Sequence, residues 1–130
     1  MTAPRRDLIV VACAVSAGVH AALVPEHFAH GAAAGLSFAA AAALLAVAAV
    51  AVTVRPTAPV FAGTAALLFG LITAYVLATT TGLPVVHPEP EPVGSLAAVT
   101  KVIEAAGLVA ALRQLRREWV PAAVTGGHGH

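Results

Sequence analysis

Histidine and glutamate residues gather in two short stretches of the sequence, and a further glutamate lies in its last apolar segment. Imidazole nitrogens and carboxylate oxygens bind copper and zinc well. A site of two or three histidines and a carboxylate is therefore chemically reasonable. The candidate metal ligands are His20, Glu26, His27, His30, His87 and Glu104.

The spacing around Pro25 bears on how these ligands are presented. His27 and His30 are three residues apart, so on a helical turn they project from one face. Pro25 lacks the amide hydrogen that a helix interior needs. We therefore expect the first helix to end near Val24 and a short interfacial turn to begin at Pro25, with Phe28 at the lipid–water boundary. The competing interpretation is that polar side chains in this loop are simply solvated.

His20 and Glu104 differ from the other ligands because they lie inside apolar segments. An ionisable residue within a membrane span usually faces the bundle interior and is paired or functional. Lys101 is three residues before Glu104, so the two can form an ion pair on one helix. Alternatively, Lys101 extends to the surface and Glu104 pairs with His20, which would carry a proton, orient a metal ligand or lock two helices together. Tyr75 is a possible further member of that network.

These side chains must be positioned by membrane-spanning helices. Of the 130 residues, 59% are hydrophobic and 10% are charged, whereas about 25% of a typical soluble domain is charged. Because a membrane span needs roughly 20 apolar residues, the sequence predicts an all-α bundle of four transmembrane helices within residues 8–117. The expected spans are residues 8–24, 32–54, 59–80 and 95–112.

The arginines predict the orientation of this bundle. They precede the first span, separate the second from the third and follow the fourth, at positions Arg5, Arg6, Arg55, Arg113, Arg116 and Arg117. With four spans all six fall on one side, which the positive-inside rule assigns to the cytoplasm. We therefore expect a multi-pass protein of the plasma membrane with both termini cytoplasmic, residues 1–7 as the N-terminal segment and residues 118–130 as a flexible tail. The histidines and glutamates of the two loops would lie on the outer face.

Composition also limits the partners. The formal net charge is +1 and no basic stripe is interleaved with aromatic residues, which argues against nucleic acid. The single cysteine, Cys13, excludes a disulfide within the chain. Gly63, Gly70 and Gly107 are small residues that allow helices to approach closely, and we interpret them as packing surfaces. The expected surroundings are the lipid bilayer and either a membrane-protein partner or a second copy of the chain.

The stretches His20, Pro25-Glu26-His27 and Pro90-Glu91-Pro92-Val93-Gly94 resemble those of small four-helix membrane proteins of actinobacteria. The resemblance covers most of the chain. It implies the four-helix topology and marks these positions as candidates, and it implies no particular activity.

Two functions follow from these patterns. The first is a membrane protein that binds copper or zinc at its extracytoplasmic face, and the alternative is a non-catalytic accessory or structural subunit of a larger membrane complex. A third interpretation, an intramembrane enzyme or proton-coupled transporter that uses His20 and Glu104, is disfavoured. Four short helices leave little room for a translocation path, and the sequence has no Gly-rich phosphate loop and no Ser–His–Asp spacing.

Overall fold

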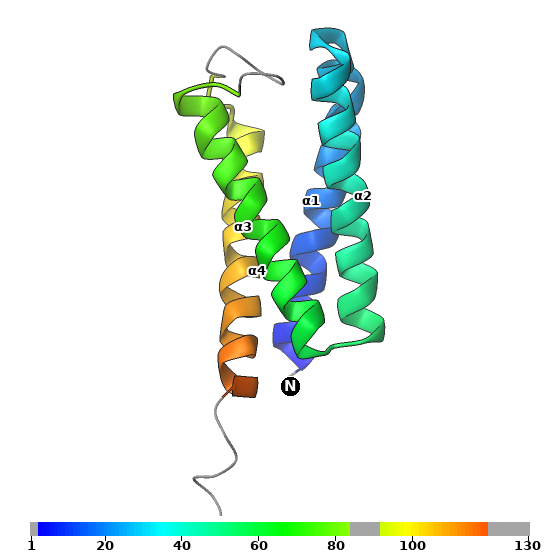
Figure 1. Cartoon of the computed structure of the whole chain (residues 1–130), viewed down its shortest axis with the longest axis vertical. Helices are drawn as coiled ribbons and strands as arrows, with labels where there is room; N and C mark the ends of the chain where they lie inside the picture. The colour runs from blue at the N-terminus through cyan, green and yellow to red at the C-terminus, as the bar shows by residue number, and fades with distance from the viewer. Residues whose placement is uncertain (1–2, 84–91, 120–130) are drawn as a thin grey trace, which may run out of the picture.

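The structure, a computed structural model, describes residues 3–83 and 92–119. These residues form four α-helices in up-and-down order: α1 (Ala3–His30), α2 (Ala32–Val54), α3 (Ala58–Thr80) and α4 (Ser95–Trp119) (Figure 1). Each helix is long and apolar enough to cross a membrane. The expected all-α fold with four such helices is therefore confirmed.

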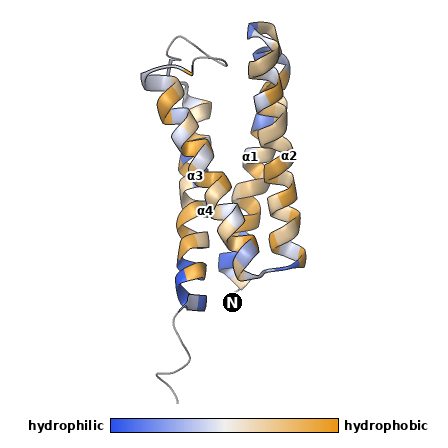
Figure 2. Cartoon of the chain, in the orientation of Figure 1, coloured by the Kyte–Doolittle hydropathy of each residue, from blue (hydrophilic) through white to orange (hydrophobic). Residues whose placement is uncertain are grey.

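The two ends of the bundle differ in their polar residues. The N-terminus, the α2–α3 connection and the last turns of α4 lie together at the bottom of Figure 1, so this end carries the six arginines. We call it the arginine end. The opposite end, which holds His27 and His30, is called the histidine end. In Figure 2 the strongest hydrophilic colour lies at the arginine end, and the middle of every helix is mainly apolar.

The prediction that the first helix ends near Val24 is wrong, because α1 continues through Pro25 to His30. An uninterrupted helix satisfies backbone groups internally, and a proline inside it removes only one bond of the ladder. The link to α2 is then the single residue Gly31, at φ 150°, a conformation that glycine adopts readily. Phe28 does not anchor a separate turn; its ring lies directly over Gly35 of α2, where a side chain would collide with it.

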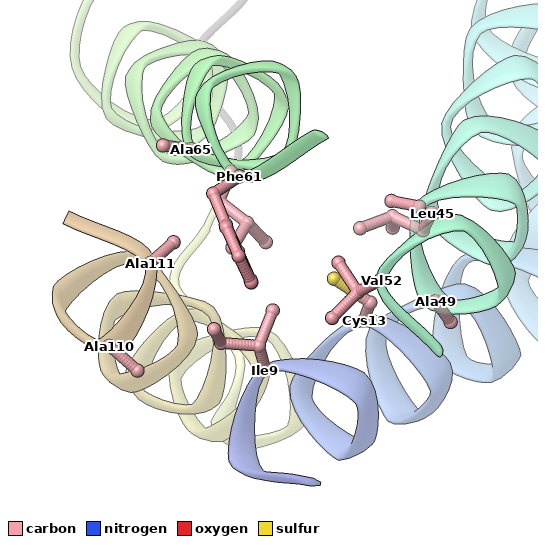
Figure 3. Close-up of a cluster of buried hydrophobic side chains, with 11 residues drawn as sticks. Ile9, Cys13, Leu45, Ala49, Val52, Phe61, Ala65, Ala110 and Ala111 are labelled. Atoms are coloured by element: carbon pink, nitrogen blue, oxygen red, sulfur yellow. The ribbon is translucent and has the colours of Figure 1, made fainter. Parts of the chain in front are cut away.

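The apolar core lies in the arginine half of the bundle. Ile9 and Cys13 of α1, Leu45 and Val52 of α2, and Phe61 of α3 are all fully buried there. Figure 3 shows these side chains converging from three helices, with Ala110 and Ala111 of α4 beside them. Contacts near the first turns of α1 and α3 therefore hold the two halves of the chain together.

The histidine half is packed differently. In α3 no residue between Leu68 and Ala78 is fully buried, and the α1–α2 hairpin diverges from the α3–α4 hairpin toward the top of Figure 1. The hairpins are therefore joined at the arginine end and separated at the histidine end.

Only one of the three glycines interpreted as packing surfaces is a close-approach point. A Cβ atom added at Gly107 would lie 2.7 Å from the Cβ of Ala12, whereas none at Gly63 or Gly70 would meet another described atom within 4 Å. Gly107 therefore allows α1 and α4 to approach each other, and Gly63 and Gly70 lie on the outer surface of α3.

Candidate functional site

Glu104 is a fully buried carboxylate, with none of its side chain exposed. It lies on the stripe of α4 that faces α1, together with Thr100, Gly107 and Ala111. Its Oε2 atom is 2.7 Å from Nζ of Lys101, and its Oε1 atom accepts a hydrogen bond from Oγ of Ser16 in α1. A buried carboxylate is costly unless it is paired and hydrogen-bonded, and here both oxygens have a donor.

Lys101 does not extend to the surface as one interpretation supposed. Only 16% of its side chain is exposed, and Nζ lies 5.5 Å from the centre of the Tyr75 ring. The ammonium group is thus held inside the bundle by Glu104 and by the ring quadrupole of Tyr75. The intrahelical ion pair is the arrangement that forms.

Ser16 stands between His20 and Glu104, and the sequence analysis missed it. Its Oγ donates to Glu104 and lies 3.4 Å from Nδ1 of His20. Among the described residues no hydrogen bond joins His20 directly to Glu104. The available signal was the spacing, because Ser16 is one helical turn before His20 and so shares its face.

The three histidines of α1 share one local geometry. Nδ1 of each ring lies within hydrogen-bond distance of the backbone carbonyl four residues earlier: 2.8 Å for His20 to Ser16, 2.9 Å for His27 to Leu23 and 2.9 Å for His30 to Glu26. A carbonyl oxygen can only accept, so Nδ1 carries the hydrogen and the lone pair of each neutral ring is on Nε2.

The structure divides the candidate metal ligands into two groups. His20 and Glu104 lie in the bundle interior, whereas His27, His30 and Glu26 lie in the last turns of α1. The rings of His27 and His30 are 6.3 Å apart between centroids, and Glu26 and His30 are exposed. His87 lies outside the described residues. Within residues 3–83 and 92–119, no group of three or more His, Cys, Asp or Glu side chains is placed to hold a metal ion.

A cavity of about 240 Å³ lies in the histidine half and is lined by side chains of all four helices. Its polar lining comes from six residues: His20, His27, Ser37, Tyr75, Thr100 and Lys101. Ser37 and Thr100 donate their hydroxyls to carbonyls of their own helices, at 2.7 and 2.8 Å. Lys101, Tyr75 and His20 are the lining residues whose polar groups we consider for contact with a bound molecule.

Tyr75 is unusual among the residues that line this cavity. Its hydroxyl is buried and has no hydrogen-bond partner among the described residues. A buried donor without a partner costs about 1–3 kcal/mol, so such groups in folded proteins usually mark a missing partner. The Tyr75 hydroxyl is therefore a candidate hydrogen-bonding group for a bound molecule.

Phe38 forms an aromatic wall beside these groups. Its ring stacks on that of His27, with 3.5 Å between centroids and 17° between planes, and lies 5.3 Å from the ring of His20. Side chains such as Leu23, Leu71 and Ala74 complete an otherwise apolar lining. The arrangement is suited to hold a small, mostly apolar molecule that carries a few hydrogen-bonding groups.

Comparison with known proteins adds no family to this description: no protein-family model, no curated protein and no solved structure matches the chain.

Proposed function

We propose that this chain is a multi-pass membrane protein that binds a small lipid-soluble molecule in the cavity between its two hairpins. The observation that carries the proposal is the cavity itself, which all four helices line. One lining residue, Tyr75, has a buried hydroxyl that finds no hydrogen-bond partner among the described residues. A molecule dissolved in the bilayer would fill the space between the two hairpins and contact the side chains that do not pack against each other there.

The proposal includes the placement of the chain in the plasma membrane. The six arginines at one end favour a cytoplasmic location for that end, which would direct the histidine end and its cavity to the extracytoplasmic face. A ligand would then enter from the outer leaflet or from the space outside.

Variants that fill the cavity test the proposal directly. Ala41 is buried in the cavity wall, whereas Ala43 is exposed on the same helix. Protein purified in mild detergent should carry about one bound small molecule per chain, identified by solvent extraction and mass spectrometry. Ala41→Trp should lose it, and Ala43→Trp should retain it.

A second pair of variants tests the same cavity in case the tryptophan variant does not fold. Ala74→Leu adds a smaller side chain from the opposite wall of the cavity, and Ala66→Leu adds the same group on the exposed face of α3. If the folded cavity variants and their surface controls carry equal amounts of the extracted molecule, the cavity is not its binding site and the proposal fails.

A second candidate function is the binding of copper or zinc at the histidine end. It is favoured by the shared geometry of the α1 histidines, because a Nδ1–H anchored on a carbonyl is the arrangement that orients metal-ligating histidines. The pair His27→Ala with His30→Ala should then abolish the metal that elemental analysis finds in dialysed protein. Unchanged metal content in that double variant would eliminate this candidate.

A further inference from the structure

Three residues from three different helices line the cavity, and each carries a different kind of hydrogen-bonding group. Lys101 of α4 has three hydrogens on Nζ, of which Glu104 accepts one. Tyr75 of α3 has a hydroxyl that can donate or accept. His20 of α1 has its hydrogen on Nδ1 and so offers a lone pair on Nε2. The cavity therefore combines donors with at least one acceptor.

The charge of the cavity wall selects against an anionic ligand. Lys101 is the only lysine or arginine in the described lining. Its positive charge is balanced by Glu104, at 2.7 Å. A ligand carboxylate that shared this ammonium group would place a second negative charge beside that of Glu104 in a region of low dielectric, unless it displaced Glu104. A neutral ligand needs no such exchange, because it can accept a second hydrogen of Nζ while the ion pair stays intact.

The volume and lining of the cavity favour a flat ring system. The stacked rings of Phe38 and His27 form an aromatic surface, and aromatic ligands pack well against such surfaces. The volume of about 240 Å³ lies below the roughly 300–1,000 Å³ of sites for drug-sized ligands. The cavity thus suits a head group of one or two rings, with any long apolar tail extending between the hairpins into lipid.

We infer that the ligand is a quinone or quinol, a neutral ring with oxygen atoms on opposite edges, held by Lys101, Tyr75 and His20. The inference rests on the function proposed above and names the chemical class of its ligand. The carbonyl oxygens of a quinone accept from Nζ of Lys101 and from the Tyr75 hydroxyl. The hydroxyl of the reduced form can also donate to Nε2 of His20.

The experiment compares three probes on the full chain in lipid nanodiscs, with empty nanodiscs as the partition control. The probes are 2-methyl-1,4-naphthoquinone, 2-methylnaphthalene, which has the same rings without oxygens, and decanoic acid. Equilibrium dialysis with absorbance detection should show saturable binding of about one quinone per chain. The naphthalene should bind at least about tenfold more weakly, since two hydrogen bonds are lost, and decanoic acid should not displace the quinone.

Two variants connect binding to the named side chains. Tyr75→Phe should weaken quinone binding about threefold to tenfold, the effect of one hydrogen bond. Folded protein should not be lost, because the hydroxyl bonds to no group in the described part of the chain. Lys101→Met combined with Glu104→Gln removes the ammonium donor without leaving an unpaired charge, and it should weaken binding by a similar factor. Thr73→Val on the exposed face of α3 is the control, with unchanged affinity.

The outcomes separate the ligand class from the proposed function. Equal affinity for the quinone and the naphthalene, or displacement by decanoic acid, would overturn the quinone assignment while leaving a cavity that binds lipid-soluble molecules. If none of the probes binds saturably and the Ala41→Trp variant behaves as the parent chain, both the assignment and the proposed function fail.

Discussion

Replacement of Lys101 by methionine is the most informative single change to this bundle. Methionine keeps the length of the apolar stem and removes the ammonium group. Glu104 would then keep only the hydrogen bond from Ser16, in a position where none of its side chain is exposed. The variant therefore leaves a buried carboxylate without its counter-charge.

The expected loss of stability follows from the burial of both partners of the ion pair. Removal of one partner of a buried ion pair costs about 3–5 kcal/mol, whereas replacement of the whole pair by uncharged groups is often close to neutral. We expect Lys101→Met to lower the free energy of unfolding by about 3 kcal/mol or more. Addition of Glu104→Gln should restore most of that loss, because a neutral amide can still accept the Ser16 hydroxyl.

Equilibrium unfolding in mixed micelles, followed by circular dichroism, measures these differences. Val102→Met is the matched control, because Val102 is a neighbour on α4 with 70% of its surface exposed. A loss of stability in Lys101→Met no larger than that in Val102→Met would refute a buried ion pair whose two charges depend on each other. Such a pair is also refuted if adding Glu104→Gln to Lys101→Met makes the chain still less stable.

Three further results are expected. Tyr75→Phe should raise the unfolding free energy of the ligand-free chain by about 1 kcal/mol or more, because it removes a buried hydroxyl that has no partner within residues 3–83 and 92–119; a loss of stability would show that the hydroxyl is bonded. Gly107→Ala should destabilise the bundle by about 1–3 kcal/mol, since its Cβ would lie 2.7 Å from that of Ala12, whereas Gly63→Ala should be neutral or stabilising by up to about 1 kcal/mol. Equal effects of the two glycine changes in the same unfolding assay would contradict the close approach of α1 and α4. A reporter enzyme fused after His130 should be active in the cytoplasm if the arginine end faces inward, and activity outside the membrane would reverse the proposed orientation.

Many residues of the candidate site could be recognised in the sequence by their type. The hydrogen bonds between them could not. His20 and Glu104 stand out because an ionisable group inside an apolar segment needs a partner. The partner that Glu104 finds across the helices is Ser16, 88 residues away in the chain. Its spacing from His20 places Ser16 on the same helix face, but this does not show that it bonds to Glu104, since a serine in an apolar run can equally bond to its own helix.

Pro25 shows how a local rule fails in this setting. Proline ordinarily ends or kinks a helix, and that rule predicted a loop containing His27 and His30. In the structure α1 continues to His30, and its last turn brings His27 onto the ring of Phe38 in α2. The packing of α2 against α1, which no local pattern encodes, outweighs the single lost hydrogen bond.

The sequence by itself determined that there are four apolar helices and that the arginines lie together at one end, because hydropathy and charge act locally along the chain. Only the tertiary structure decided that the hairpins join at the arginine end and diverge at the histidine end. That outcome depends on which side chains meet: Phe61 fills the space between the hairpins at one end, whereas the half-buried side chains of α3 around Tyr75 leave a cavity at the other. Contacts between residues far apart in the chain set this difference, so the cavity and the place of Tyr75 in its wall become visible only in three dimensions.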